Sequence, residues 1–396
     1  MMALSARFST NPTFAGTDPR ERGKGFAKES NRLLDLRDVS LSTAQACVLL
    51  GAISITEGEA AAESVYYSTA CRIASLLDLA NKPTSDGIER EVNVRVWWSL
   101  TMIDVWSSSG VRLPRQMVHL ENVPLPIDEN VYLNLRRGQP VQQDHDTKSS
   151  LLAQMIQLNS ILKEVNDLNE CIVSGAVSGS QLEKDVLSLS QKLDNWHAAL
   201  PTNMHDTQVN LQYWASQGLG RIFVAVYLGY YHFGQLLFYQ FLHQDHSTVP
   251  NARFYATKCK GHAESLCELV YSAQRTANSE VLYTMVGHIL VIASTVQIHT
   301  LLFSDSEAQI STARTRLEKN FEILSRLQGY WSTLDISFTR LRAFHQACRK
   351  SMDTSFRLDQ WMLRFLYEFA EPVDDKFPED KEWNLENIGI SPQSWA

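Results

Sequence analysis

Residues 94–110 read VRVWWSLTMIDVWSSSG, and this stretch decides the fold class. On a helical wheel, apolar side chains lie nearly all round residues 94–106, and three of them are tryptophans. A helix that is apolar on every side belongs in the middle of a bundle. The stretch therefore predicts a central core helix. An aromatic-lined pocket for a small-molecule effector is the alternative interpretation.

Two charged side chains interrupt this predicted helix. Arg95 follows Glu91 by one turn, in the order that favours an ion pair within a helix. Asp104 lies nine residues after Arg95, on the opposite side of the helix, so these two cannot pair within it. A buried carboxylate needs a hydrogen-bond donor. We expect Arg112 or Arg115, which follow the helix, to supply that donor.

Apolar residues at alternating spacings of three and four recur along most of the chain, which is typical of helices. Thr56 with Glu59 matches a capping box, and Asp86 with Glu89 marks another helix start. No alternating strand pattern is found, so the predicted fold is all-α, an irregular multi-helix bundle. The later helices are expected at residues 210–244, 252–277, 280–303, 308–330 and 338–370, after a polar connection at 128–149 and a Gly/Ser-rich linker near 175.

The composition is that of a globular protein. Of 396 residues, 44% are hydrophobic and 20% are charged. The net charge is -8, so the chain as a whole lacks the excess of basic residues that is typical of a DNA-binding domain. The six cysteines show no zinc-ligand spacing and predict buried free thiols in a reducing compartment. The N-terminus has no long apolar run of the kind found in a signal peptide.

Two long stretches, residues 222–242 and 281–303, contain no Asp, Glu, Lys or Arg. Each is long enough to span a bilayer. Each also contains histidine and glutamine, which are costly in lipid but find partners in a protein core. We therefore predict two buried helices and no membrane contact.

Motifs for catalysis are weak. The sequence HQDH at residues 243–246 places two histidines three apart, which permits a metal site on a helix, but no third ligand is identifiable. Solvated residues at a helix end are the preferred interpretation. No Gly-x-Ser-x-Gly elbow, phosphate-binding loop or zinc-protease motif occurs. The chain is predicted not to be an enzyme.

The run IEREVNVRVWWSLTMIDVWSSSGVRLPRQM, followed by VPLP, resembles the signature of the fungal-specific transcription factor regulatory domain, the middle homology region of fungal binuclear zinc-cluster regulators. The stretches ESVYYSTACRIASLLDLA, LDNWHAALP, YYHFGQLLFYQFLH and LQGYW are similar to further family motifs. Most members carry more basic residues before the aromatic pair, and the family's Gly-Arg-Pro turn is here GVRLP. The residues of the signature that we single out are Glu91, Arg95, Trp97, Trp98, Asp104, Gly110, Arg112 and Pro114.

The resemblance implies the regulatory, non-DNA-reading domain of a nuclear transcription regulator. Such a domain would control RNA polymerase II transcription of pathway genes, with a metabolite gene cluster as a candidate target. Its implied partners are the transcription machinery or an intact regulator, and a small-molecule effector. We expect one regulatory domain over residues 1–370, with a signature part at 56–127 and a helical C-terminal part at 150–370, and a loose acidic tail at 371–396.

Members normally begin with a six-cysteine zinc cluster that reads DNA, and this sequence lacks one. We therefore expect no cofactor in this chain, and DNA contact only through a missing zinc cluster. Two explanations stay open, a truncated gene model and a genuine product without its DNA-reading module. The alternative function is a stand-alone effector-binding or protein-interaction modulator that lacks DNA binding.

Overall fold

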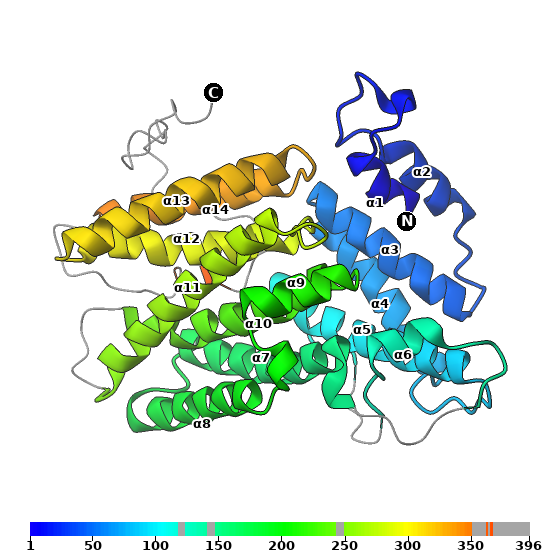
Figure 1. Cartoon of the computed structure of the whole chain (residues 1–396), viewed down its shortest axis with the longest axis horizontal. Helices are drawn as coiled ribbons and strands as arrows, with labels where there is room; N and C mark the ends of the chain where they lie inside the picture. Colours follow the sequence, from blue (N-terminus) through cyan, green and yellow to red (C-terminus); the bar gives the residue numbers. More distant parts are fainter. Residues whose placement is uncertain (118–122, 141–146, 243–248, 351–361, 363–364, 367–396) are drawn as a thin grey trace. The chain divides into compact units, whose positions relative to one another are not determined.

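The computed structural model describes residues 1–117, 123–140, 147–242, 249–350, 362 and 365–366. Within these residues the chain forms fourteen α-helices, five short 3-10 helices and no β-strand, which confirms the predicted all-α multi-helix fold (Figure 1). The first seven α-helices are α1 (Met2–Ser5), α2 (Lys24–Leu33), α3 (Leu41–Glu57), α4 (Ala60–Leu76), α5 (Gly87–Val111), α6 (Glu129–Asn134) and α7 (Leu151–Val173). The others are α8 (Gly179–Ala198), α9 (Gln208–Ser216), α10 (Gly220–Phe238), α11 (Ala252–Arg275), α12 (Met285–Phe303), α13 (Glu307–Gln328) and α14 (Leu334–Lys350).

The chain divides into two compact units. Unit 1 comprises Met1–Ser160, Leu200–His205 and Gly329–Thr333, and unit 2 comprises the remaining residues. The boundary at Ser160 falls inside α7. This division does not test the predicted single regulatory domain over residues 1–370, which stays a prediction.

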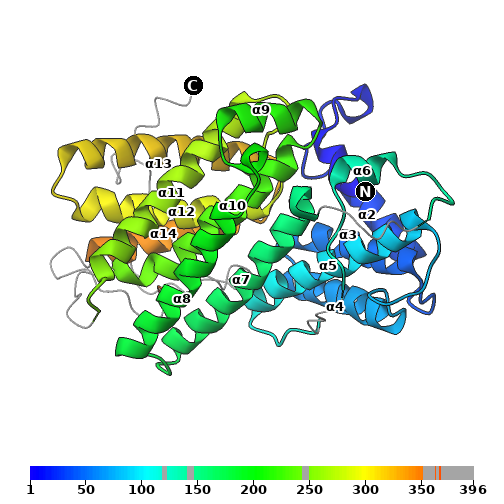
Figure 2. The same ribbon diagram turned by 60° about the horizontal axis from the view of Figure 1, so that its bottom comes forward.

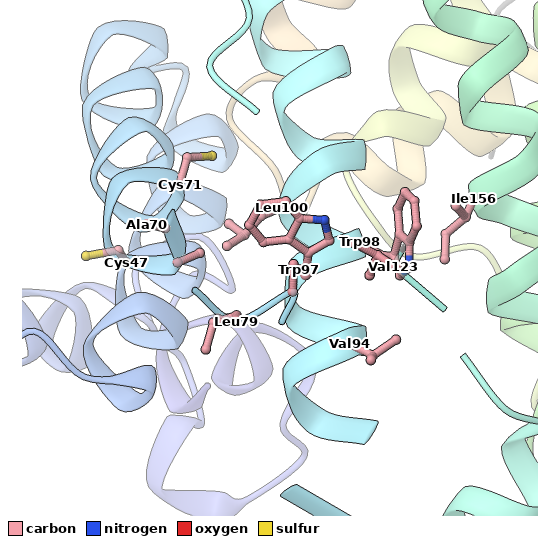
Figure 3. Packing of buried hydrophobic residues seen from close by; sticks show 12 residues of the cluster. Cys47, Ala70, Cys71, Leu79, Val94, Trp97, Trp98, Leu100, Val123 and Ile156 are labelled. Carbon is pink, nitrogen blue, oxygen red and sulfur yellow. The ribbon is translucent and has the colours of Figure 1, made fainter. Parts of the chain in front are cut away.

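Helices α3, α4 and α5 form the centre of unit 1 and pack side by side (Figures 1 and 2). Gly51 allows close approach, since a Cβ atom at this position would lie 2.4 Å from the Tyr67 ring. Figure 3 shows Trp97 of α5 pointing toward α3 and α4, and Trp98 lying beside Val123 and Ile156. The opening stretch therefore is a core helix, as its apolar wheel predicts.

Two helix boundaries differ from the sequence predictions because glycines end the helices. Thr56 lies in the last turn of α3, where its hydroxyl donates to the Ile53 carbonyl at 2.6 Å. Gly58 then adopts φ 81°, and α4 begins at Ala60, so the predicted capping box is wrong. The single helix expected at residues 210–244 is likewise wrong, because Gly218 separates α9 from α10 with φ 74°.

Unit 2 contains both long uncharged stretches, as helices Gly220–Leu242 and Met285–Phe303. Both are long and apolar enough to cross a membrane, and 78% and 83% of their most apolar windows are buried inside the protein. Their polar groups find partners there: the Tyr239 hydroxyl donates to Thr295 Oγ1 at 2.7 Å, and the amide of Asn320 donates to Ser294 Oγ at 3.0 Å. These contacts favour buried core helices.

All six cysteines are free thiols, and only Cys171 is not fully buried. This agrees with the predicted buried thiols. The predicted acidic tail at 371–396 and the HQDH sequence at 243–246 lie outside the described residues.

Candidate functional site

The signature residues lie on α5, which is followed by a segment that runs back along it. We call residues 112–140 the return segment, described at 112–117 and 123–140. It contacts α5 in reverse order, so that its first residues meet the end of the helix and its last residues meet the start.

Asp86 begins α5 as the sequence predicts. Its Oδ1 accepts the backbone N–H groups of Ile88 and Glu89 at 2.8 and 3.1 Å. Its other carboxylate oxygen accepts the N–H of Gly138 at 2.7 Å, and the Gly87 N–H donates to the Gln139 carbonyl at 2.8 Å. One carboxylate thus caps the helix and also holds the last part of the return segment. These hydrogen bonds keep the pKa of Asp86 below its usual range.

Glu91 and Arg95 form the ion pair that their spacing predicts, with Arg95 Nε 2.8 Å from Glu91 Oε1. Both side chains also bind the backbone of Ile127: the Ile127 N–H donates to Glu91 Oε1 at 3.1 Å, and Arg95 donates to the Ile127 carbonyl at 2.7 Å. The Arg95 guanidinium lies 4.1 Å from the centre of the Tyr132 ring, within cation–π range. The pair therefore fixes the middle of the return segment.

Glu129 contacts both Arg95 and the first residues of α7. It lies 3.9 Å from Arg95, is buried, and accepts hydrogen bonds from Ser150 Oγ, Leu151 N and Leu152 N at 2.9–3.0 Å. Its carboxylate satisfies N–H groups that the first turn of a helix leaves without intrahelical partners. Sequence reasoning missed Glu129, because its donors lie 21–23 residues away and no local pattern marks them.

Trp97 and Trp98 are both buried in the core of unit 1. Trp98 also donates its indole N–H to the Pro124 carbonyl at 2.9 Å. Each ring packs against core residues, which favours a structural role over the lining of an effector pocket.

We expect Trp98→Phe to lower the free energy of unfolding by about 1–3 kcal/mol, because it removes this hydrogen bond and leaves a small cavity. Urea denaturation measures the loss. Trp97→Phe is the matched control, since it removes the same ring atoms from the same cluster without touching the Pro124 carbonyl. Equal losses in both variants would show that the indole hydrogen bond contributes nothing.

Asp104 fixes the start of the return segment. Its Oδ2 accepts the backbone N–H groups of Gln116 and Met117 at 2.7 and 2.8 Å, and its Oδ1 accepts Ser108 Oγ at 3.1 Å. The donors to Asp104 are therefore two backbone amides and a hydroxyl, and the predicted arginine donor, Arg112 or Arg115, is wrong. A backbone amide brought back by the turn reaches the buried carboxylate without burying a second charge.

The turn itself explains this arrangement. Gly110 is buried in the last turn of α5, and Arg112 ends the helix with φ 55°. The Leu113 N–H donates to the Ser108 carbonyl at 2.9 Å, which closes the helix end. Arg112 and Pro114 are exposed. The chain therefore reverses here and reaches Asp104 from outside the helix.

A buried glutamate that sequence reasoning did not single out lies across from the same end of α5. Glu63, in the first turn of α4, is 4% exposed and accepts a hydrogen bond from Ser107 Oγ at 3.1 Å. Burial raises the pKa of Glu63 to about 7. Farther along α4, burial and the nearby Asp104 raise the pKa of the Cys71 thiol to about 12. No apolar period or capping pattern would have marked Glu63.

Within the described residues, no three His, Cys, Asp or Glu side chains gather so that they could hold a metal ion. The polar side chains of α5 bind backbone groups of the return segment instead. The site holds one helix and one segment together.

The protein is thus an all-helical scaffold, and side chains of its signature hold the return segment against α5. The sequence model of the fungal specific transcription factor domain matches residues 1–198, which include α5 and the return segment. The chain belongs to this family, and it contains a transcription factor regulatory domain. No curated protein and no solved structure is detectably similar to it. The motifs after residue 198 lie beyond the matched range.

Proposed function

We propose that the chain sets the activity of a nuclear transcription regulator that controls pathway genes transcribed by RNA polymerase II, with a metabolite gene cluster as a candidate target. The family match over residues 1–198 carries this proposal. The signature residues of α5 bind backbone groups of the return segment, which supports a scaffold role for the signature. The partners proposed are the transcription machinery or an intact regulator, with a small-molecule effector as a further candidate.

In this proposal the polypeptide binds no cofactor and reads no DNA sequence by itself. Its net charge is -8, and its cysteines lack zinc-cluster spacing. Zinc and specific DNA contact would belong to a separate zinc-cluster module. Sequence-specific binding of the purified chain to a short duplex in an electrophoretic shift experiment would contradict this part.

A reporter experiment tests the regulatory role. The full chain is fused to an unrelated DNA-binding domain and expressed in a fungal host with the matching reporter. We expect the fusion to change reporter transcription relative to the DNA-binding domain alone, and Asp104→Ala to abolish the change. The exposed Asp305→Ala is the control and should behave as the unmodified chain.

A stably expressed nuclear fusion that leaves the reporter unchanged would overturn the proposal. If the fusion acts only when an intact regulator is co-expressed, the chain is a stand-alone modulator instead.

A further inference from the structure

Residues Gly329–Thr333 read GYWST and lie between α13 and α14 in the chain. Both helices belong to unit 2, but these five residues group with unit 1. We call them the GYWST segment. Such a short connection, surrounded by residues distant in sequence, needs specific contacts that hold it there.

Arg7 and Thr56, elsewhere in unit 1, bind the backbone of the GYWST segment at two points. The Arg7 guanidinium donates to the Tyr330 carbonyl at 2.7 Å, and the Thr333 N–H donates to the Thr56 carbonyl at 3.2 Å. Between them, the hydroxyl of Ser332 donates to Glu57 Oε2 at 3.4 Å. The Tyr330 carbonyl, the Ser332 hydroxyl and the Thr333 N–H of the segment are thus paired, as in a bound peptide.

Aromatic contacts hold the two large side chains of the segment. Trp331 is only 4% exposed, and the Arg7 guanidinium carbon lies 5.1 Å from the centre of its ring. The Phe8 ring meets Trp331 edge-on at 5.3 Å and lies 4.6 Å from the Tyr330 ring. Cation–π and aromatic contacts of this kind add to the energy of burial. They involve two consecutive aromatic residues of the segment, Tyr330 and Trp331.

The binding surface is held by contacts of its own. Arg7 is buried and forms an ion pair with Glu57, so its charge is compensated without the segment. Arg22 donates to the Ser9 carbonyl at 2.9 Å and to the Arg7 carbonyl at 3.4 Å, which fixes the backbone around Phe8. These contacts involve no atom of the GYWST segment.

We propose that Arg7, Phe8, Thr56 and Glu57 form a peptide-binding site, which the chain's own GYWST segment fills. The site takes short peptides of the same chemistry, with two consecutive aromatic residues followed by a hydroxyl residue. A partner protein that presents such a peptide would compete with the segment for the site.

A labelled peptide of sequence LQGYWST tests the proposal by fluorescence anisotropy with the full chain. In the wild type the site is filled, so we expect weak binding. In Trp331→Ala, or the milder Tyr330→Ala, the internal competitor is weakened, and the peptide should bind at least about tenfold more tightly. Adding Phe8→Leu should reverse this gain, whereas adding the exposed Arg37→Met should leave it unchanged.

Circular dichroism establishes that each variant is folded. A peptide in which alanine replaces tryptophan should not bind to any of them. The proposal is overturned if folded Trp331→Ala and Tyr330→Ala chains bind LQGYWST no better than the wild type. It is also overturned if Phe8→Leu leaves the gain intact.

Discussion

Asp104→Ala is expected to lower the free energy of unfolding by about 3–5 kcal/mol. The carboxylate is buried and receives the N–H groups of Gln116 and Met117 on one oxygen. Each hydrogen bond to a charged acceptor contributes about 1.5–3 kcal/mol. Alanine removes the oxygen that accepts both hydrogen bonds and leaves two partly buried amides without an acceptor.

Urea denaturation followed by circular dichroism measures this loss. Asp104→Asn is the informative second variant, because its side-chain oxygen can still accept from both amides. We expect Asp104→Asn to lose less than half as much as Asp104→Ala. The exposed Asp305→Ala should be within about 0.5 kcal/mol of the wild type. An Asp104→Ala variant as stable as the wild type would show that the carboxylate does not hold the return segment.

The hydrogen-bond donors to Asp104 could not be predicted from the sequence, whereas the partner of Glu91 could. The Glu91–Arg95 pair could be predicted, because both residues stand on one helix at a fixed spacing. The donors to Asp104 could not, because a backbone amide has no sequence signature and any residue at position 116 or 117 supplies one. Glu129 was missed for the same reason, since two of its three donors are backbone amides at the start of α7.

The helices themselves were predictable, because apolar residues on one face at the helical period leave few other folds. Two of the errors fall at glycines that adopt positive φ, and the polar connection predicted at 128–149 contains helix α6 (Glu129–Asn134). Gly58 separates α3 from α4 and Gly218 separates α9 from α10. The position of the GYWST segment was also beyond prediction, because its contact with Arg7 joins residues 323 apart in sequence.

Because of Glu63, the free energy of unfolding is expected to fall as the pH rises. The folded chain holds this carboxyl in a buried place between α4 and α5, and burial raises its pKa from an ordinary value of 4.5 to about 7. Between these two values the folded chain retains a proton that the unfolded chain releases, so increasing pH favours unfolding. A tenfold change in proton affinity corresponds to about 1.4 kcal/mol, so the full loss is about 3 kcal/mol.

Glu63→Gln removes this dependence while keeping an oxygen that can accept from Ser107. We expect the variant to match the wild type near pH 5 and to exceed its free energy of unfolding by about 2–3 kcal/mol at pH 8. The difference between the two chains, from urea denaturation at intervals of half a pH unit, isolates Glu63 because the other titrating groups are shared. Glu59→Gln, at an exposed position one turn earlier, is the matched control for the loss of a carboxyl outside the core. A difference between Glu63→Gln and the wild type that does not change with pH would mean that Glu63 is ionised without penalty, and that the α4–α5 contact tolerates the charge.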